Sequence, residues 1–237
     1  MSVDSVISWL AETTIAVSLL IVGVLLTRKI VARKFGAGAA YLLWLAPLAR
    51  MLAPELKILP PPDRAPVAAA TWIEAAPSAF VGAEPAGGAI LNLPIAAASI
   101  WAAGALFFLA WQFYKQRRFI NAATVRSQAA PPDLIAETEE IAARFGLRKA
   151  PPIRIAADAT GPLVAGALRP LIILPADFAS RYSPVERRLA LAHECAHIRR
   201  GDLLATFAAL LFRAAQWPNP LVHYAFSAFR ADQESAC

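Results

Sequence analysis

The chain has 237 residues, of which 58% are hydrophobic and 17% are charged, and its formal net charge is +6. Its mean hydropathy of +0.50 is too apolar for an ordinary soluble enzyme of this length. The basic residues are scattered and no base-reading motif accompanies them, so direct binding of nucleic acid is not expected. The composition therefore predicts a protein that is partly embedded in a lipid bilayer.

Three apolar segments, at about 5–27, 35–53 and 89–114, are predicted to cross the membrane as helices. The first segment contains Glu12, and the second carries Arg50 near its end, where a long side chain can reach the interface. A signal peptide is the alternative interpretation of the first segment. No small-residue cleavage site precedes the basic cluster that follows it, so a retained membrane anchor is favoured.

Basic residues directly follow the first and the third apolar segments, and such residues mark the cytoplasmic side of a membrane. We therefore expect the N-terminus and the Pro/Ala-rich loop 54–88 to lie outside the cell. The chain then divides into a membrane region, 1–118, and a cytosolic domain, 119–237, in a multi-pass protein of the cytoplasmic membrane. The basic residues are Arg28, Lys29, Arg33, Lys34, Lys115, Arg117 and Arg118.

The predicted cytosolic domain begins with an amphipathic helix over 131–147, followed by strand-like segments at 152–156, 163–166 and 170–175. These segments predict a small sheet. An edge strand of such a sheet can bind an extended peptide through backbone hydrogen bonds. The alternative is a strand that only packs in the core. The candidate substrate-binding residues on this strand are Val164, Ala165 and Gly166.

A helix is predicted over about 184–200, because its start and its end carry clear signals. Ser183 and Glu186 form a potential capping box, and Pro184 occupies the first helical position, where no amide donor is needed. No helix breaker follows until Gly201, which is expected to end the helix.

The second half of this helix contains the sequence HECAH, with His193 and His197 four residues apart and therefore on one face. Neutral imidazoles are good zinc ligands, and Glu194 can accept a proton from the metal-bound water. This H-E-x-x-H pattern is typical of zinc metallopeptidases. The alternative is a buried helix with two hydrogen-bonded histidines. Cys195 is expected to be a packing residue, and a disulfide with Cys237 is not expected in the cytosol.

A catalytic zinc ion usually has three protein ligands, so a third ligand is required beyond the two histidines. The candidates downstream are His223, Asp232 and Glu234. A single membrane crossing by 203–217 would place them on the wrong side, so this stretch is predicted to be a re-entrant hairpin or a packed soluble helix. Asp202 is expected to cap the start of that helix, not to bind the metal.

HECAHIRRGD, followed by WPNPLVHYAFSAFRADQESAC, resembles the BlaR/MecR antirepressor family of integral-membrane zinc metallopeptidases. The upstream GPLVAGALRPLIILP is similar to the strand region of that family. The resemblance implies a predominantly α membrane protein with three transmembrane helices and a cytosolic α+β domain of the gluzincin type. It also implies that His193, His197 and Glu234 bind one Zn²⁺ ion per chain and that Glu194 is the catalytic base. His223 stands where the family often has tryptophan and is expected to pack, not to bind metal.

The resemblance further implies a regulatory endopeptidase that cleaves itself or a cytosolic repressor. The expected partners are membrane lipid and a peptide or protein substrate, with a transcriptional repressor among the candidates, and a homodimer is also considered. The chain stops at Cys237, one residue short of the family motif, so a C-terminal truncation is expected. Two alternatives remain: a non-proteolytic receptor or scaffold with a structural zinc site, and a constitutive quality-control metallopeptidase.

Overall fold

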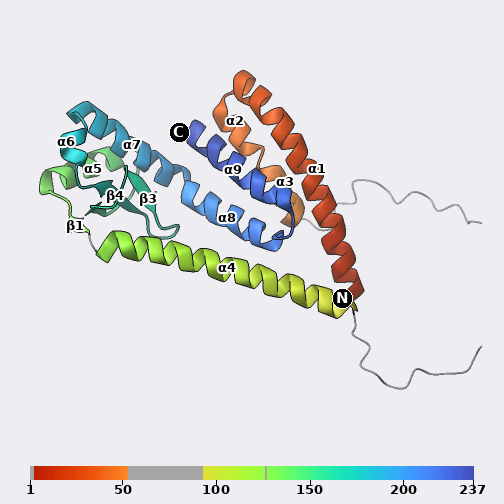
Figure 1. Cartoon of the computed structure of the whole chain (residues 1–237). Helices are drawn as coiled ribbons and strands as arrows, with labels where there is room; N and C mark the ends of the chain where they lie inside the picture. The colour runs from red at the N-terminus through yellow and green to blue at the C-terminus, as the bar shows by residue number, and fades with distance from the viewer. Residues whose placement is uncertain (1–2, 53–92, 126) are drawn as a thin grey trace, which may run out of the picture.

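The computed structural model describes residues 3–52, 93–125 and 127–237, so the predicted loop 54–88 lies outside the described residues. Two long helices, α1 (Val3–Phe35) and α4 (Leu93–Val125), begin at the same corner and diverge from it (Figure 1). Over Ser8–Phe35 and Leu93–Val125 these helices are long and apolar enough to cross a membrane. Both extend beyond the apolar segments predicted from the sequence, because the basic residues that follow each segment continue the helix.

The second predicted span is not one continuous helix. It is divided into α2 (Ala37–Leu42) and α3 (Leu45–Leu52), with a turn at Leu43 and Trp44 between them. Pro47 contributes to this break, because it has no N–H to bond the carbonyl of Leu43 four residues earlier. Both short helices pack back along α1. The structure therefore does not confirm one membrane-crossing helix at 35–53, and it shows two short helices there.

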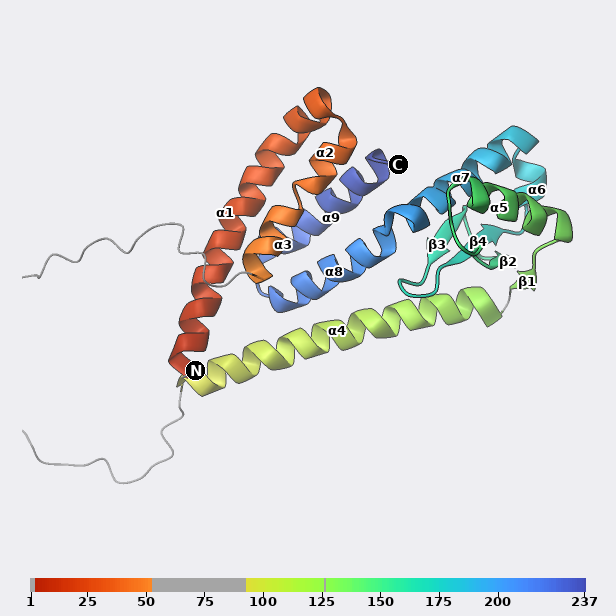
Figure 2. The ribbon, with the colours of Figure 1, turned by 180° about the vertical axis from the view of Figure 1, so that it is seen from behind.

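The last two helices, α8 (Asp202–Ala215) and α9 (Pro220–Ser235), form an antiparallel hairpin. The hairpin lies between α1 and α4, with α8 beside α4 and α9 beside α1 and α2 (Figures 1 and 2). Asn219 caps α9, because its side chain accepts a hydrogen bond from the Leu221 N–H at 3.0 Å. The chain thus returns toward the end from which it left, as the predicted site requires.

The tip of the hairpin docks against the apolar part of α4. The indole N–H of Trp217 donates to the carbonyl of Trp101 at 3.0 Å, and the indole N–H of Trp101 donates to the carbonyl of Ala215 at 3.0 Å. Gly104 makes room for this contact, because a Cβ atom there would lie 2.4 Å from the Trp217 ring. The close approach explains why a glycine occurs within this long helix.

The sheet has the strand order β1-β2-β4-β3, with β2 and β4 parallel and the other pairs antiparallel. Its strands are β1 (Gln128–Ala129), β2 (Ile153–Ala156), β3 (Leu163–Ala165) and β4 (Leu171–Pro175). The three strands predicted from the sequence are confirmed, whereas the two-residue β1 was not predicted. β3 forms one edge of the sheet.

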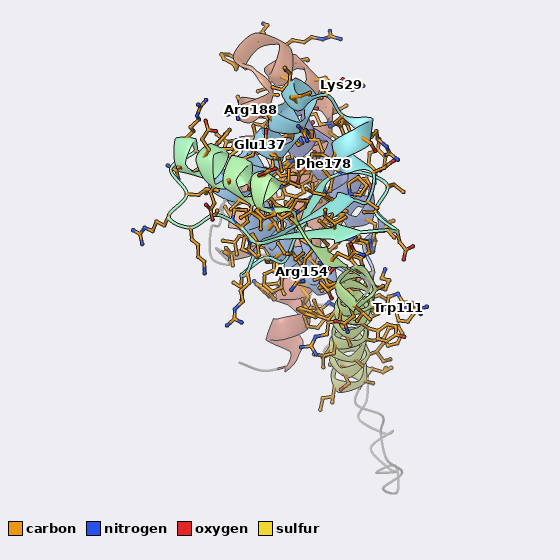
Figure 3. All side chains as sticks on the ribbon, turned by 90° about the vertical axis from the view of Figure 1, so that its left-hand side faces the viewer. Lys29, Trp111, Glu137, Arg154, Phe178 and Arg188 are labelled. Atoms are coloured by element: carbon orange, nitrogen blue, oxygen red, sulfur yellow. The ribbon has the colours of Figure 1, made fainter. Side chains whose placement is uncertain are left out.

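One face of the sheet is covered by α5 (Pro132–Arg144), α6 (Phe178–Arg181) and α7 (Pro184–Arg200). On the surface of this layer, Arg188 of α7 lies 3.8 Å from Glu137 of α5, and Figure 3 shows the two side chains next to each other. The end of α4 packs on the opposite face of the sheet. The core under α5 and α7 includes Leu134, Ile141, Ile172, Leu174, Phe178, Leu191 and Cys195.

Candidate active site

The helix that carries HECAH is α7, and its ends are formed as predicted. The Ser183 hydroxyl accepts from the Glu186 N–H at 3.4 Å, and the Glu186 carboxylate accepts from the Ser183 N–H at 2.8 Å. Gly201 ends the helix in the left-handed region, with φ of 73°. A β-carbon is disfavoured in that conformation, so glycine is the natural residue at this stop.

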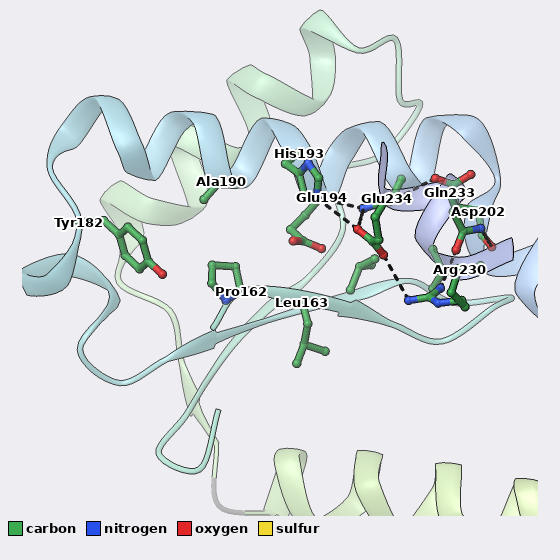
Figure 4. A pocket seen from close by; sticks show the side chains of 13 residues that line it. Pro162, Leu163, Tyr182, Ala190, His193, Glu194, Asp202, Arg230, Gln233 and Glu234 are labelled. Atoms are coloured by element: carbon green, nitrogen blue, oxygen red, sulfur yellow. Dashed lines mark hydrogen bonds and ion pairs between the residues drawn. The ribbon is translucent and has the colours of Figure 1, made fainter. Parts of the chain in front are cut away.

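Three predicted metal ligands converge at the end of α7. The Nε2 atoms of His193 and His197 lie 3.1 Å apart. The Oε2 atom of Glu234, from the last turn of α9, lies 3.4 Å from His197 Nε2 and 3.8 Å from His193 Nε2. Figure 4 shows Glu234 reaching the histidine side of α7 from the neighbouring helix. The hairpin thus brings together residues that are far apart in the sequence.

Asp202 is not the helix cap that the sequence suggested. Its side chain makes no capping hydrogen bond, and its Oδ2 atom instead lies 2.7 Å from His197 Nδ1. The left-handed turn at Gly201 redirects the chain, so Asp202 lies back against α7 and is buried. A carboxylate at Nδ1 holds the proton there and leaves the Nε2 lone pair for a metal. The signal for this role was the aspartate five residues after the second histidine.

Glu194, the predicted catalytic base, is 7% exposed and points from α7 toward β3 (Figure 4). Burial raises the pKa of this carboxyl above its ordinary value. The charge of His197 opposes the increase, the negative charge of Glu234 adds to it, and a hydrogen bond from the Val164 backbone opposes it. Glu194 therefore lies in an environment that favours its protonated form more than water does.

The candidate site opens into a cavity of about 390 Å³ between α7, the hairpin and the edge of the sheet. Pro162, Leu163 and Val164 form its wall on the side of β3. Of the three residues predicted to bind substrate, only Val164 lines this cavity. Ala165 is buried, and Gly166 lies beyond the end of the strand in a turn with φ of 88°. The first half of β3 is therefore the part of the edge strand that borders the cavity.

A model of the BlaR1 peptidase M56 family matches residues 8–237, which is nearly the whole chain. The chain belongs to this peptidase family. It is also 37% identical, over 76 residues, to the regulatory protein BlaR1 of Bacillus licheniformis. That alignment covers 32% of this chain and 12% of the relative, so the chain spans only a small part of the relative's length. The similarity to BlaR1 and the two long apolar helices indicate a membrane protein.

The donor set of this M56 peptidase fits a zinc ion. Two imidazole nitrogens face each other, and a carboxylate oxygen faces both of them. Because Asp202 engages His197 at Nδ1, the Nε2 lone pair of His197 points toward His193 Nε2. A cation or a proton must therefore lie between these two nitrogens. Two histidines and one glutamate match the ligand types of a catalytic zinc site with an open fourth position.

Cys237 is a further potential ligand that sequence reasoning did not propose. Three residues each place one donor atom within 4.8 Å of the other two: His193, His197 and Cys237. The thiol is 3.7 Å from the carbonyl oxygen of His193, and the residue is exposed. Thiolate sulfur is a common zinc ligand, so Cys237 belongs to the chemistry that must be tested at this site.

The other two candidates for the third ligand lie away from the histidines and have their own partners. His223 lies on the first turn of α9, where it accepts from Arg213 at 3.0 Å and pairs with the carbonyl of Trp217 at 2.8 Å. Asp232 forms an ion pair of 2.6 Å with Arg28 of α1. Both side chains thus fasten α9 to its surroundings, which agrees with the expectation that His223 packs.

Proposed function

We propose that this M56 peptidase is a membrane-embedded zinc endopeptidase of the regulatory type, which cleaves itself or a cytosolic repressor. The observation that supports it most strongly is the approach of Glu234 Oε2 to His193 Nε2 and His197 Nε2, within 3.8 Å, next to the buried Glu194. The regulatory role is drawn from the similarity to the regulatory protein BlaR1.

In this proposal, His193, His197 and Glu234 hold one zinc ion. When bound, zinc supplies a Lewis acid that polarises a carbonyl group and makes water more acidic. Glu194 accepts the proton of the attacking water and passes it to the leaving amine. Glu194 is shielded from solvent beside the two imidazoles, so its carboxyl can hold the proton between the two transfers.

The free edge of β3 is the proposed docking site for the substrate. Among the described residues, β4 is the one strand that pairs with β3, and the first half of β3 borders the cavity. An extended peptide can add to such an edge through main-chain hydrogen bonds. This docking would carry the scissile bond past Glu194, which lies next to the Val164 backbone. The proposed substrate class is therefore an extended segment of a protein, and no contact with nucleic acid is invoked.

We further propose a multi-pass topology in the cytoplasmic membrane, with the N-terminus outside and the peptidase site on the cytosolic side. α1 and α4 begin at the same corner (Figure 1), and the basic residues of both helices lie toward their other ends. The α8–α9 hairpin would enter the membrane between them, since its tip contacts Trp101 in α4. The expected partners are membrane lipid and the protein substrate.

The proposal is tested with Glu194→Gln, which removes the base but leaves all three metal ligands. Zinc content per chain and cleavage of an unstructured test protein are measured on the full chain in lipid. We expect zinc to be retained and cleavage to fall by about 10²- to 10⁴-fold, the usual contribution of a general base. Glu139→Gln, on the exposed surface of α5, is the matched control and keeps full activity. Cleavage at the wild-type rate by Glu194→Gln would refute the mechanism.

A second candidate function is a non-proteolytic receptor or scaffold with a structural zinc site. The observation that favours it is the position of Cys237, which is near enough to both histidines to act as a fourth protein ligand. Structural zinc sites are usually closed by four protein ligands. In that case Cys237→Ser would lose zinc affinity and the wild-type protein would cleave nothing.

A further inference from the structure

Gln233, on the last turn of α9, has a side-chain amide that is fully buried and fully hydrogen-bonded. The residue is 0% exposed. Its Nε2 donates to the carbonyl of Asp202 at 3.0 Å and to the hydroxyl of Tyr41 at 3.1 Å. Its Oε1 accepts from Thr206 at 3.2 Å and from Arg230 at 2.6 Å. A primary amide has two donor hydrogens and two acceptor lone pairs, and here all four are used.

One of these hydrogen bonds leads to Glu234. Arg230 donates through Nη1 to Gln233 and through Nη2 to the Oε1 atom of Glu234 at 3.3 Å. The planar guanidinium fixes the directions of both bonds. Arg230 thus occupies one carboxylate oxygen of Glu234, and the other, Oε2, is the atom that lies 3.4 Å from His197.

A second hydrogen bond leads from Gln233 to His197. The backbone carbonyl of Asp202 accepts from Gln233, and the carboxylate of the same residue contacts His197 Nδ1 at 2.7 Å. A single buried amide is therefore linked to Glu234 through Arg230 and to His197 through Asp202. Two of the donor groups, which come from different helices, are held by one connected network.

We propose that Gln233 and Arg230 are positioning residues that set the distance and orientation of Glu234 relative to His193 and His197. The proposal rests on the proposed function, because it takes these three residues as zinc ligands. It predicts that metal affinity depends on a side chain that does not touch the metal. Partners of this kind usually contribute about 10- to 100-fold to metal affinity.

The position of α9 itself has an independent anchor. Asp232, the residue before Gln233, pairs with Arg28 at 2.6 Å and accepts from the indole N–H of Trp44 at 2.8 Å. These contacts remain when the amide of Gln233 is removed. Replacement of Gln233 is therefore expected to release the Glu234 side chain, while α9 stays packed against α1.

The test measures the dissociation constant for Zn²⁺ alone, by competition with a chelator, on the full chain in detergent. Gln233→Met keeps the length of the side chain without its hydrogen bonds, and we expect zinc binding to weaken by about 10- to 100-fold. Arg230→Lys keeps the charge but loses the planar fork, and it is expected to weaken zinc binding by about 10-fold. Because the Arg230 side chain is 45% exposed, this second variant leaves no cavity in the core.

The matched control is Gln216→Met. Gln216 is also buried, at 4% exposed, but it lies at the far end of the hairpin, where its Oε1 accepts from Thr14 at 3.0 Å. This variant should lose thermal stability and keep the wild-type affinity for zinc. Wild-type affinity in both Gln233→Met and Arg230→Lys, or an equal loss in Gln216→Met, would overturn the positioning role. A wild-type chain that binds no zinc would overturn the proposed function as well.

Discussion

Among single residues, Asp202 has the most direct effect on the donor set, because its carboxylate lies 2.7 Å from His197 Nδ1 and is buried. A neutral partner at this position would stabilise less well the His197 tautomer that carries its proton on Nδ1 and leaves Nε2 for the metal. Asp202→Asn is therefore expected to weaken zinc binding by about 10- to 100-fold, as measured by chelator competition. Asp133→Asn, on the exposed first turn of α5, is the control. Unchanged zinc affinity in Asp202→Asn would show that this contact does not prepare His197 for a metal.

The positions of some site residues could be predicted from the sequence, and the positions of others could not. His193, Glu194 and His197 could be predicted, because a capped helix fixes which side chains share a face. Asp202 could not be placed by the same reasoning. Counting residues around a helix assumes that the helix continues, and the left-handed Gly201 breaks it immediately before Asp202.

Among the elements, the α8–α9 hairpin depends on close contact with α4. A Cβ atom at position 104 would lie 2.4 Å from the indole of Trp217, so Gly104→Ala forces the hairpin tip and α4 apart. We expect this variant to be destabilised by about 1–3 kcal/mol, the usual cost of overpacking. The measurement is thermal unfolding of the full chain in detergent.

The control for this contact is Gly23→Ala in α1, where a Cβ atom would meet nothing within 4 Å. Alanine favours helix more than glycine does, so Gly23→Ala should leave the melting temperature unchanged or raise it. If Gly104→Ala melted at the same temperature as Gly23→Ala, the hairpin tip would not be docked against α4 as described.

Elements with local signals could be predicted, and elements formed by distant contacts could not. α7 and α9 have proline and capping side chains at their starts, and β2, β3 and β4 are separated by turn residues. In contrast, β1 has two residues and forms only by pairing with β2. The break between α2 and α3 was also missed, because the apolar composition of the segment outweighed its one sequence signal, Pro47.

In the whole molecule, the site is completed by tertiary packing. The sequence required that the chain return from the hairpin to the histidines, since Glu234 must meet them. The sequence did not show which contacts hold the α8–α9 hairpin in the position that brings Glu234 to the histidines. The structure shows two anchors, the Trp217–Trp101 contact at the tip and the Asp232–Arg28 ion pair near the site. The long apolar helices α1 and α4 thereby help to position a ligand of the proposed zinc ion.

In the proposed site, zinc is held by two histidines and Glu234, with no sulfur ligand. X-ray absorption at the zinc edge of zinc-loaded Glu194→Gln protein tests this most directly, because the variant keeps the ligands without the proposed base. We expect a ligand shell of nitrogen and oxygen at about 2.0–2.2 Å that includes two imidazoles. A sulfur ligand at about 2.3 Å, which Cys237 would supply, or a shell without imidazole would contradict it.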